Sequence, residues 1–186
     1  MTKKKNELWE WTKALLIAIL LAAVIRYFLF APIVVDGLSM MPTLQDQDRM
    51  IVNKFSYDLG QPKRFDIIVF HAPEKKDYIK RVIGLPGDRI EYKNDTLYVN
   101  GKAYKEPYLD KYKKQVADGP LTDPFTLEET AVGQKTVPKG ELFVMGDNRR
   151  FSKDSRHIGS IPLSKVIGKT SIVYWPLKDA RIVKVK

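Results

Sequence analysis

The pattern of apolar and polar positions divides the chain into two unlike parts. From Trp11 to Phe30 the residues are predominantly apolar, over about the 20 positions that a helix needs to span a bilayer. Beyond this segment, helical periodicity gives way to short runs rich in β-branched and aromatic residues, which predict strands. The runs are RMIVNKF (49–55), FDIIVFHA (65–72), YIKRVIGL (78–85), RIEYK (89–93), TLYVNG (96–101), ELFVMGD (141–147) and TSIVYWPL (170–177).

Turn chemistry between these runs supports an antiparallel arrangement. Asn94-Asp95 and Asn100-Gly101 stand on either side of TLYV and are typical of two-residue hairpin loops. Residues 104–139 are polar and broken by proline, so we expect a long excursion or small subdomain on the sheet rather than a second independent core. The predicted fold is therefore mainly β, an antiparallel β-sheet domain behind one N-terminal transmembrane helix.

The basic residues before the apolar segment predict its orientation. Three lysines at positions 3–5 precede it, and the positive-inside rule then places residues 1–10 in the cytoplasm and the β-rich domain at 31–186 outside the cell membrane. A cleaved signal peptide is the rival interpretation, because it has the same order of basic, apolar and small-residue regions. Bulky Leu29 occupies the position where a cleavage site needs a small residue, so we favour an uncleaved, single-pass anchor at 11–30.

Composition narrows the classes of chemistry. The chain of 186 residues carries a formal net charge of +10, which indicates an anionic partner such as nucleic acid or an acidic lipid surface. It contains no cysteine, which excludes disulfides, thiolate metal sites and a cysteine nucleophile. His71 and His157 are its two histidines and neither has a second histidine at ligand spacing, so we expect neither a metal nor a cofactor.

A serine in DGLSMMPTL, residues 36–44, is a candidate nucleophile. Ser39 can attack a carbonyl only if a neighbouring base takes its proton. One candidate base is a histidine, His71 or His157, in a Ser-His-Asp arrangement with Asp154. The other candidate is a lysine.

Lys80 lies inside the apolar run YIKRVIGL, where the period of two of a strand sends Lys80 and Arg81 to opposite faces. The ordinary pKa of a lysine is about 10.4, so the amine is almost always charged at neutral pH. Burial among apolar side chains disfavours the ammonium and lowers the pKa by about 3 units or more, towards the range of a general base. A lysine in a strand is more often solvated or snorkelling, so the choice depends on the neighbouring segments.

A third polar segment, MGDNRRFSKDSRHIG at 145–159, follows an apolar strand. It is either a turn held by ion pairs or a group of hydroxyls and carboxylates that positions a lysine amine. Its polar residues include Asp147, Asn148, Arg149, Ser152, Asp154, Ser155 and Arg156.

Taken in order, these three segments resemble the motifs of the type I signal peptidases, the membrane-bound Ser/Lys endopeptidases of bacterial secretion. SMMPT at 39–43 is similar to the nucleophile box, YIKRVIGLPGD at 78–88 to the lysine box, and GDNRRFSKDSR at 146–156 to the C-terminal box. The resemblance covers nearly the whole chain and is closest to the Gram-positive branch of peptidase family S26. It implies a β-rich catalytic domain of antiparallel sheets with a hydrophobic membrane-facing surface.

The resemblance also assigns roles to single residues. It implies that Ser39 is the nucleophile and that Lys80 is the general base, which later protonates the leaving amine. It further implies that Ser152 hydrogen-bonds the lysine amine, while Asp154 and Arg156 brace the loop. The other supporting residues are Asp147 and Arg149, whereas Arg81, on the opposite face of the strand, is implied to be structural. The resemblance places Ile33, Val35, Tyr78 and Ile79 along the substrate pockets, and we expect Met40 to make a flexible apolar contact with the bound peptide.

One position departs from the family pattern. Some members have a serine two residues before the nucleophile, whose hydroxyl helps to bind the oxyanion, whereas Gly37 stands here. The Ser39 backbone N–H is then the one oxyanion donor that the resemblance still identifies.

By the same resemblance, the chain is an endopeptidase that removes signal peptides from secreted preproteins after small residues. Its expected partners are these signal peptides and anionic lipid headgroups, with no nucleic acid, and the oligomeric state stays open. Two alternatives also stay open: an inactive membrane-anchored binding module and a Ser/Lys self-cleaving repressor-like protein. The repressor would need a recognition helix, and this sequence begins with an apolar anchor instead.

Overall fold

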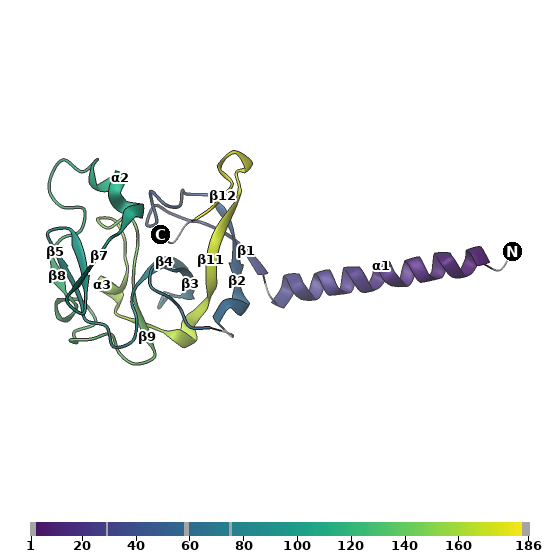
Figure 1. Cartoon of the computed structure of the whole chain (residues 1–186), viewed down its shortest axis with the longest axis horizontal. Helices are drawn as coiled ribbons and strands as arrows, with labels where there is room; N and C mark the ends of the chain where they lie inside the picture. Colours follow the sequence, from purple (N-terminus) through teal and green to yellow (C-terminus); the bar gives the residue numbers. More distant parts are fainter. Residues whose placement is uncertain (1–2, 29, 58–59, 75, 184–186) are drawn as a thin grey trace.

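Figure 1 shows a β-rich body from which one long N-terminal helix projects. This computed structural model describes residues 3–28, 30–57, 60–74 and 76–183. The helices are α1 (Lys3–Phe28), α2 (Asp110–Lys113) and α3 (Ser155–Ile158). The strands are β1 (Phe30–Val34), β2 (Arg49–Asn53), β3 (Ile67–His71), β4 (Asp77–Gly84), β5 (Ile90–Lys93), β6 (Thr96–Val99), β7 (Lys102–Tyr104), β8 (Phe125–Thr126), β9 (Glu141–Met145), β10 (Ile161–Pro162), β11 (Val166–Trp175) and β12 (Arg181–Ile182).

The strands pair antiparallel and form two sheets. The large sheet has the order β1-β2-β11-β3-β4-β9-β10, with β12 paired to β11, and the small sheet has the order β7-β6-β5-β8. The predicted runs correspond to β2, β3, β4, β5, β6, β9 and β11, so the prediction of a mainly antiparallel β fold is confirmed. The strands that the pattern missed are β7, β8, β10 and β12, which are very short, and β1, which follows the N-terminal helix directly.

The two predicted turn signals form tight hairpins in the small sheet. Asn94-Asp95 connects β5 to β6, and Asn100-Gly101 connects β6 to β7, with the flanking residues paired in register. All four residues have φ between 49° and 78°. Asparagine, aspartate and glycine tolerate this left-handed region best, which is why they favour such turns.

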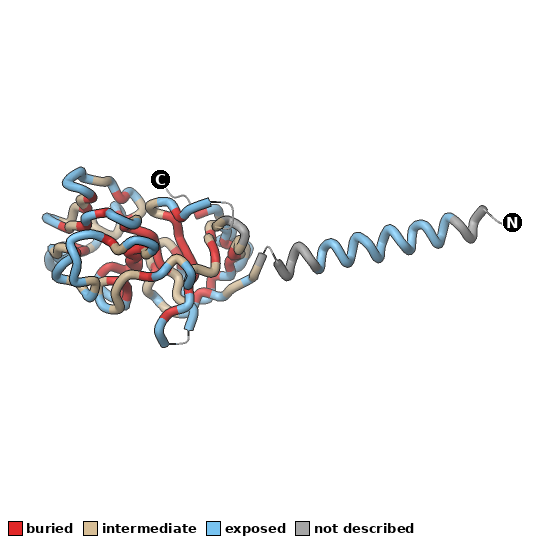
Figure 2. Tube along the Cα trace, turned by 90° about the horizontal axis from the view of Figure 1, so that it is seen from below, coloured by how far each residue is buried: buried red, intermediate tan, exposed pale blue. Residues whose placement is uncertain are grey.

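The helix α1 stands apart from the body and is exposed over residues 7–23 (Figure 2). Among the residues that the structure describes, no helix is long and apolar enough to cross a membrane. The predicted spanning segment at 11–30 includes residue 29, which lies outside the described residues. A helix is therefore present where the sequence predicts one, but the transmembrane span is not confirmed.

The excursion at 104–139 returns to the small sheet as β8 and adds to a shared core. Its residues Leu127 and Val137 are buried in one cluster with residues of both sheets. The other buried members of this cluster are Ile83, Ile90, Tyr92, Leu97, Val99, Phe143 and Met145. One apolar core thus joins the small sheet to β4 and β9 of the large sheet.

Strand β4 is covered on both faces, and this decides where its two cations lie. Ile83 packs in the cluster shared with the small sheet, whereas Val82 packs with Ile68 in a separate cluster. Consequently Lys80 and Arg81 are both buried although they point to opposite faces.

Candidate active site

Ser39 lies in the turn between β1 and β2 and is held by the loop that follows β9. The backbone N–H of Asn148 donates to the Ser39 carbonyl at 3.1 Å, and the Asn148 side chain donates to the Leu38 carbonyl at 3.1 Å. A Cβ at Gly146 would clash with the Ser39 carbonyl oxygen and with Ser152 Oγ. The missing side chain at Gly146 therefore allows the loop and the turn to approach each other.

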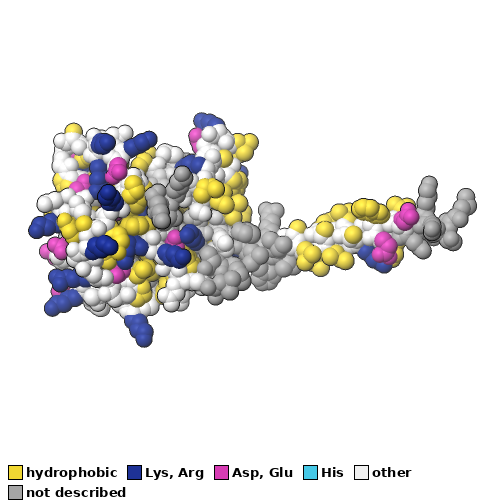
Figure 3. All heavy atoms as spheres, viewed as in Figure 1, with side chains coloured by type: hydrophobic (Ala, Val, Ile, Leu, Met, Phe, Trp, Pro, Cys, Tyr) yellow, Lys and Arg dark blue, Asp and Glu magenta, His cyan; other side chains and the backbone are white. Residues whose placement is uncertain are grey.

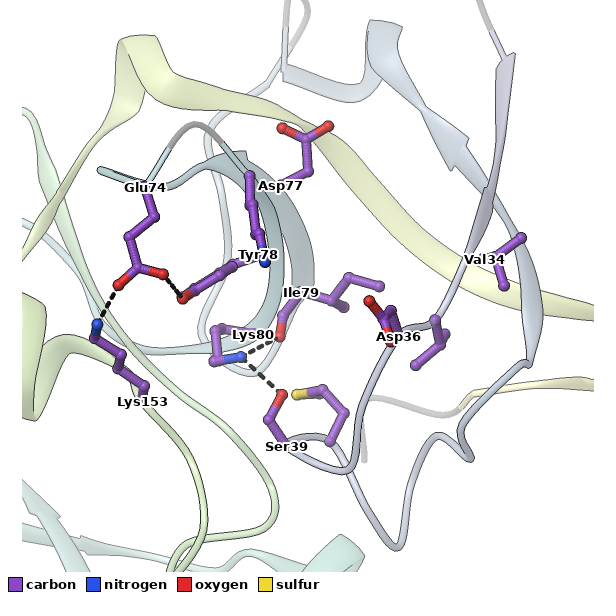
Figure 4. Close-up of a pocket in the computed structure, with 12 residues that line it drawn as sticks. Val34, Asp36, Ser39, Glu74, Asp77, Tyr78, Ile79, Lys80 and Lys153 are labelled. Atoms are coloured by element: carbon purple, nitrogen blue, oxygen red, sulfur yellow. Dashed lines mark hydrogen bonds and ion pairs between the residues drawn. The ribbon is translucent and has the colours of Figure 1, made fainter.

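The Lys80 amine points at the Ser39 hydroxyl (Figure 4). Its Nζ lies 2.8 Å from Ser39 Oγ and 3.0 Å from the Ile79 carbonyl oxygen. The Lys80 side chain is buried, with 4% exposure. Burial lowers the pKa of Lys80 from 10.5 to about 8, although the carboxylates of Asp154 and Asp147 act in the opposite direction. The amine can therefore be neutral near pH 7 and accept a proton from the hydroxyl it contacts.

Asp154 and Arg156 form an ion pair at the start of α3. Arg156 Nε and Nη2 donate to the two carboxylate oxygens at 2.8 and 2.9 Å, and the Gly146 N–H donates to Asp154 Oδ2 at 3.0 Å. Burial opposes the ionisation of Asp154, but Arg156 holds the pKa of this carboxyl below its usual value. Arg156 also donates to the Arg149 carbonyl at 2.7 Å, so the loop after β9 is tied at both ends.

Ser152 is buried in this loop but does not make the bond expected from the resemblance. Its hydroxyl oxygen makes no hydrogen bond of normal geometry within the described part of the chain, although it lies close enough to the Asp154 carboxylate to help lower the pKa of that group. The Lys80 amine contacts Ser39 and the Ile79 carbonyl instead. Because Ser152 Oγ lies against Gly146, which also approaches Ser39, the hydroxyl is near these groups and retains its hydrogen-bonding capacity.

Arg81 points away from Lys80 into a buried ion pair. Its Nε and Nη2 donate to the Asp147 carboxylate at 2.8 and 2.6 Å, and its Nη1 donates to the Phe65 carbonyl at 2.9 Å. The same carboxylate accepts a hydrogen bond from the Thr43 hydroxyl. Burial works against the charge of Arg81, but Asp147 raises the pKa of the guanidinium above its usual value. Through Thr43, this ion pair holds the turn that carries Ser39.

Arg149 connects the loop after β9 with the excursion at 104–139, a contact that the sequence pattern does not reveal. Its guanidinium lies 2.5 Å from the Glu106 carboxylate, and both side chains are buried. Burial opposes both charges, but Glu106 raises the pKa of Arg149 and Arg149 lowers the pKa of Glu106. The hydroxyls that also bond Arg149 are those of Tyr92, Tyr108 and Thr122.

A cavity of about 280 Å³ opens beside Ser39 and Lys80. Of the predicted substrate-binding residues, four line it: Val35, Met40, Tyr78 and Ile79. Ile33 does not, and packs against a buried cluster that includes Val35 and Met40. Ile33 and Val35 would share one face of a continuous strand, but β1 ends at Val34, so strand alternation does not predict which of the two lines the cavity. The lining residues that the sequence did not single out are Val34, Asp36, Glu74, Lys76, Asp77 and Lys153.

Gly37, the position where some relatives have a serine, is engaged elsewhere. Its φ is 93°, a conformation that favours glycine. Its N–H donates to Asp46 Oδ1 at 2.8 Å, so it is not free to act as an oxyanion donor.

The histidines lie outside the cavity. His71 Nδ1 lies 2.7 Å from Asp77 Oδ1 on the surface, and His157 is exposed in α3. Within the ranges that the structure describes, no three His, Cys, Asp or Glu side chains are arranged to hold a metal. Lys80 is thus the basic side chain in contact with Ser39.

Comparison with known proteins identifies the family. The family model described as "Signal peptidase, peptidase S26" matches residues 8–175. A signal peptidase I of Bacillus caldolyticus is 54% identical over 182 residues, 96% of this chain and 97% of the relative. A signal peptidase IB of Staphylococcus aureus is 41% identical over 178 residues, 94% of this chain and 93% of the relative. A crystal structure of a signal peptidase I from Enterococcus faecalis V583 is 44% identical, with a TM-score of 0.57, and covers 59% of this chain and 97% of its own.

These relatives come from Bacillus, Staphylococcus and Enterococcus, so the expected likeness to the Gram-positive branch is confirmed. The matches extend over nearly the whole chain, including all three motifs and the β-rich body. The chain therefore belongs to the signal peptidase family, peptidase S26, and is a serine peptidase.

Proposed function

We propose that the chain is a membrane-anchored endopeptidase that removes N-terminal signal peptides from preproteins after small residues, with Ser39 as nucleophile and Lys80 as general base. The observation that carries the proposal is the 2.8 Å contact between Lys80 Nζ and Ser39 Oγ, made where burial lowers the pKa of Lys80 to about 8. With this pKa roughly one amine in ten is neutral at pH 7, against about one in 2,500 for a free lysine. The full-length relatives named signal peptidase I support the substrate class.

In the proposed reaction, the Lys80 amine takes the Ser39 proton as Oγ bonds to the scissile carbonyl carbon. The Ser39 backbone N–H stabilises the oxyanion that forms. The Lys80 ammonium then protonates the leaving amine as the C–N bond breaks, which leaves an ester on Ser39. A water molecule, deprotonated by Lys80, hydrolyses this ester and releases the signal peptide.

The residues around the Ser39–Lys80 dyad are proposed to position it. Ser152 has a buried hydroxyl that makes no hydrogen bond of normal geometry in the described chain, and we assign it the role of accepting a hydrogen bond from the Lys80 ammonium during turnover. The ion pairs that hold the surrounding loop and turn involve Asp147, Arg149, Asp154 and Arg156.

The substrate is proposed to bind as an extended strand. Among the described strands, β1 pairs with β2 alone, so it offers a sheet edge beside the cavity. Backbone hydrogen bonds along such an edge supply affinity, whereas the cavity walls select side chains. The bulky walls formed by Val35, Met40, Tyr78 and Ile79 then favour small residues before the scissile bond.

Membrane attachment is proposed to use the segment at 11–30, with residues 1–10 in the cytoplasm and the catalytic domain outside. Besides the apolar side chains of α1, a second apolar group is exposed on the body near β11 and β12 (Figure 3). The members of this group are Ile172, Trp175, Leu177 and Ile182. The net charge of +10 favours anionic headgroups.

Attachment is tested by flotation of the full chain with anionic and neutral lipid vesicles. We expect co-flotation with both, stronger with the anionic vesicles, and a large decrease after deletion of residues 1–30. Flotation that is unchanged by this deletion would contradict the anchor.

Peptidase activity is tested by cleavage of a preprotein in detergent. We expect Ser39→Ala and Lys80→Ala each to lower kcat/KM by at least about 10²–10⁴-fold, because each removes a group that acts in the transition state. His157→Ala, which alters an exposed histidine outside the cavity, is the matched control and should remain active. Full activity of Lys80→Ala would exclude the dyad.

A further inference from the structure

The cavity beside the dyad has an ion pair at one end and a single carboxylate at the other. In Figure 4, Glu74 and Lys153 lie on one side of Ser39 and Lys80, while Asp36 lies on the other. Glu74 belongs to the connection between β3 and β4, and Lys153 belongs to the loop between β9 and α3. Their ion pair therefore joins two separate walls of the cavity.

This ion pair is exposed enough for one partner to be exchanged. Lys153 Nζ contacts Glu74 Oε1, and the Tyr78 hydroxyl donates to Glu74 Oε2 at 2.9 Å. The side chains of Lys153 and Glu74 are 56% and 46% exposed. Because ion pairs in contact with water are screened and contribute little to stability, another carboxylate can replace Glu74 at low cost.

The backbone keeps Lys153 at this place even though its ammonium is exposed. Its neighbours Ser152 and Asp154 are both buried. Asp154 is further tied to Arg156 and to the Gly146 N–H. The backbone of Lys153 is therefore fixed, and its ion pair with Glu74 keeps the ammonium beside the cavity in the free enzyme.

Apart from Glu74, the charges of this wall do not neutralise Lys153. Lys76 lines the same cavity and adds a second positive charge. The Asp77 carboxylate points away from Ser39 (Figure 4), towards His71, whose Nδ1 lies at 2.7 Å. An anionic substrate side chain could thus replace Glu74 on Lys153 beside the second ammonium, whereas a cationic one would have to displace Lys153 from Glu74 and would be repelled by Lys76.

We infer that Lys153 is a specificity-determining residue that pairs with an acidic substrate side chain just after the scissile bond. The inference rests on the proposed function, in which small residues before the bond occupy the apolar walls at Val35 and Ile79. The substrate chain beyond the scissile bond then passes the opposite end of the cavity, where Glu74 and Lys153 lie. There Lys153 exchanges Glu74 for the substrate carboxylate, and Glu74 holds the ammonium in place when no substrate is bound.

The test uses the full chain and peptides that carry glutamate, glutamine or lysine in turn at each position flanking the scissile bond. We expect wild-type kcat/KM for glutamate to exceed that for glutamine by about fivefold at a position after the bond, and lysine to be worse than glutamine. Lys153→Ala should bring the glutamate-to-glutamine ratio close to one, and Lys153→Arg should keep it. Glu74→Gln, which removes the competing carboxylate, should raise the ratio, and high salt should reduce it.

Lys139→Ala, which removes an exposed lysine outside the cavity, is the matched control and should leave the ratio unchanged. A ratio that neither Lys153→Ala nor Glu74→Gln alters overturns the inference, as does an effect confined to positions before the bond. Should Lys153→Ala fail to fold, Glu74→Gln and Lys153→Arg still decide the question. Failure of the wild type to cleave any peptide would instead reject the proposed function.

Discussion

Lys80 and Arg81 are neighbours on β4 and both are buried, yet the pKa of Lys80 is lowered and the pKa of Arg81 is raised. On one face, the Lys80 amine contacts a hydroxyl and a carbonyl, and burial lowers its pKa to about 8. On the other, Arg81 makes two hydrogen bonds with Asp147, and its pKa is raised despite burial. The side chains are 4% and 0% exposed, so the extent of burial does not explain the difference.

The difference lies in the partner that each cation contacts. A buried ammonium without a carboxylate in contact loses stability relative to the neutral amine, and its pKa falls. A guanidinium paired with a carboxylate through two parallel hydrogen bonds stays charged, and its planar fork suits that pairing. The face of β4 that carries Arg81, the paired face, therefore supports the fold. The face that carries Lys80, the unpaired face, provides the proposed base, and each role can be disturbed separately.

The largest expected effect comes from removing the carboxylate that pairs with Arg81. Asp147→Ala leaves Arg81 buried without its counter-ion, and we expect the free energy of unfolding to fall by about 3–5 kcal/mol. Urea unfolding followed by circular dichroism measures this change. The control is Asp118→Ala, which removes an exposed partner of Arg150 and should have no measurable effect. Equal stability of the two variants would mean that the buried pair contributes nothing.

Removing the unpaired cation should have the opposite sign. Lys80→Met replaces a buried ammonium by an apolar side chain, and we expect it to raise the free energy of unfolding by about 2 kcal/mol at pH 7. The pKa of Lys80 in the folded chain, about 8, lies below the ordinary lysine value of 10.5, so the unfolded chain binds more protons between these values. The wild type therefore becomes more stable as the pH rises through this window, and the advantage of the variant should shrink.

Unfolding of both proteins at pH 7 and near pH 10 tests this sign. Lys139→Met, at an exposed lysine, retains Lys80 and serves as the control, so its stability should follow that of the wild type at both pH values. A constant difference between Lys80→Met and the wild type across the window would contradict a lowered pKa.

The pH dependence of cleavage tests the lowered pKa of Lys80 in a second way. Since only the neutral Lys80 amine can accept the Ser39 proton, kcat/KM should rise about tenfold per pH unit below an apparent pKa of about 8 and level off above it. Initial rates on one peptide across this range supply the profile. His157→Ala should give the same midpoint, and a midpoint near the ordinary histidine value would point to a different base.

The smallest expected effect is on substrate preference and comes from the apolar wall of the cavity beside Lys80. Val35→Ala widens the cavity, so we expect cleavage of peptides with a valine in place of the small residue to improve about fivefold relative to alanine. Competition between the two peptides measures the ratio. Val52→Ala alters an equally buried valine outside this cavity and should leave the ratio as it is.

The candidate site was predictable in part, because its chemistry resides in short motifs. Ser39 and Lys80 stand out by residue type and by their place in ordered boxes, and Arg156 lies two positions from its partner Asp154. The pairing of Arg149 with Glu106 and of Lys153 with Glu74 links residues 43 and 79 positions apart. No local periodicity relates such positions, so these contacts follow only from the way the loops meet.

The amino-acid sequence alone specifies the strands with long apolar runs and the hairpin turns at Asn94-Asp95 and Asn100-Gly101, because local sterics and side-chain alternation act over a few residues. It also specifies that the side chains of Lys80 and Arg81 leave β4 on opposite faces. The groups that cover each face of β4 depend on contacts between distant segments. Packing placed a hydroxyl against Lys80 and a carboxylate against Arg81, and the free energy of a buried charge depends on such contacts.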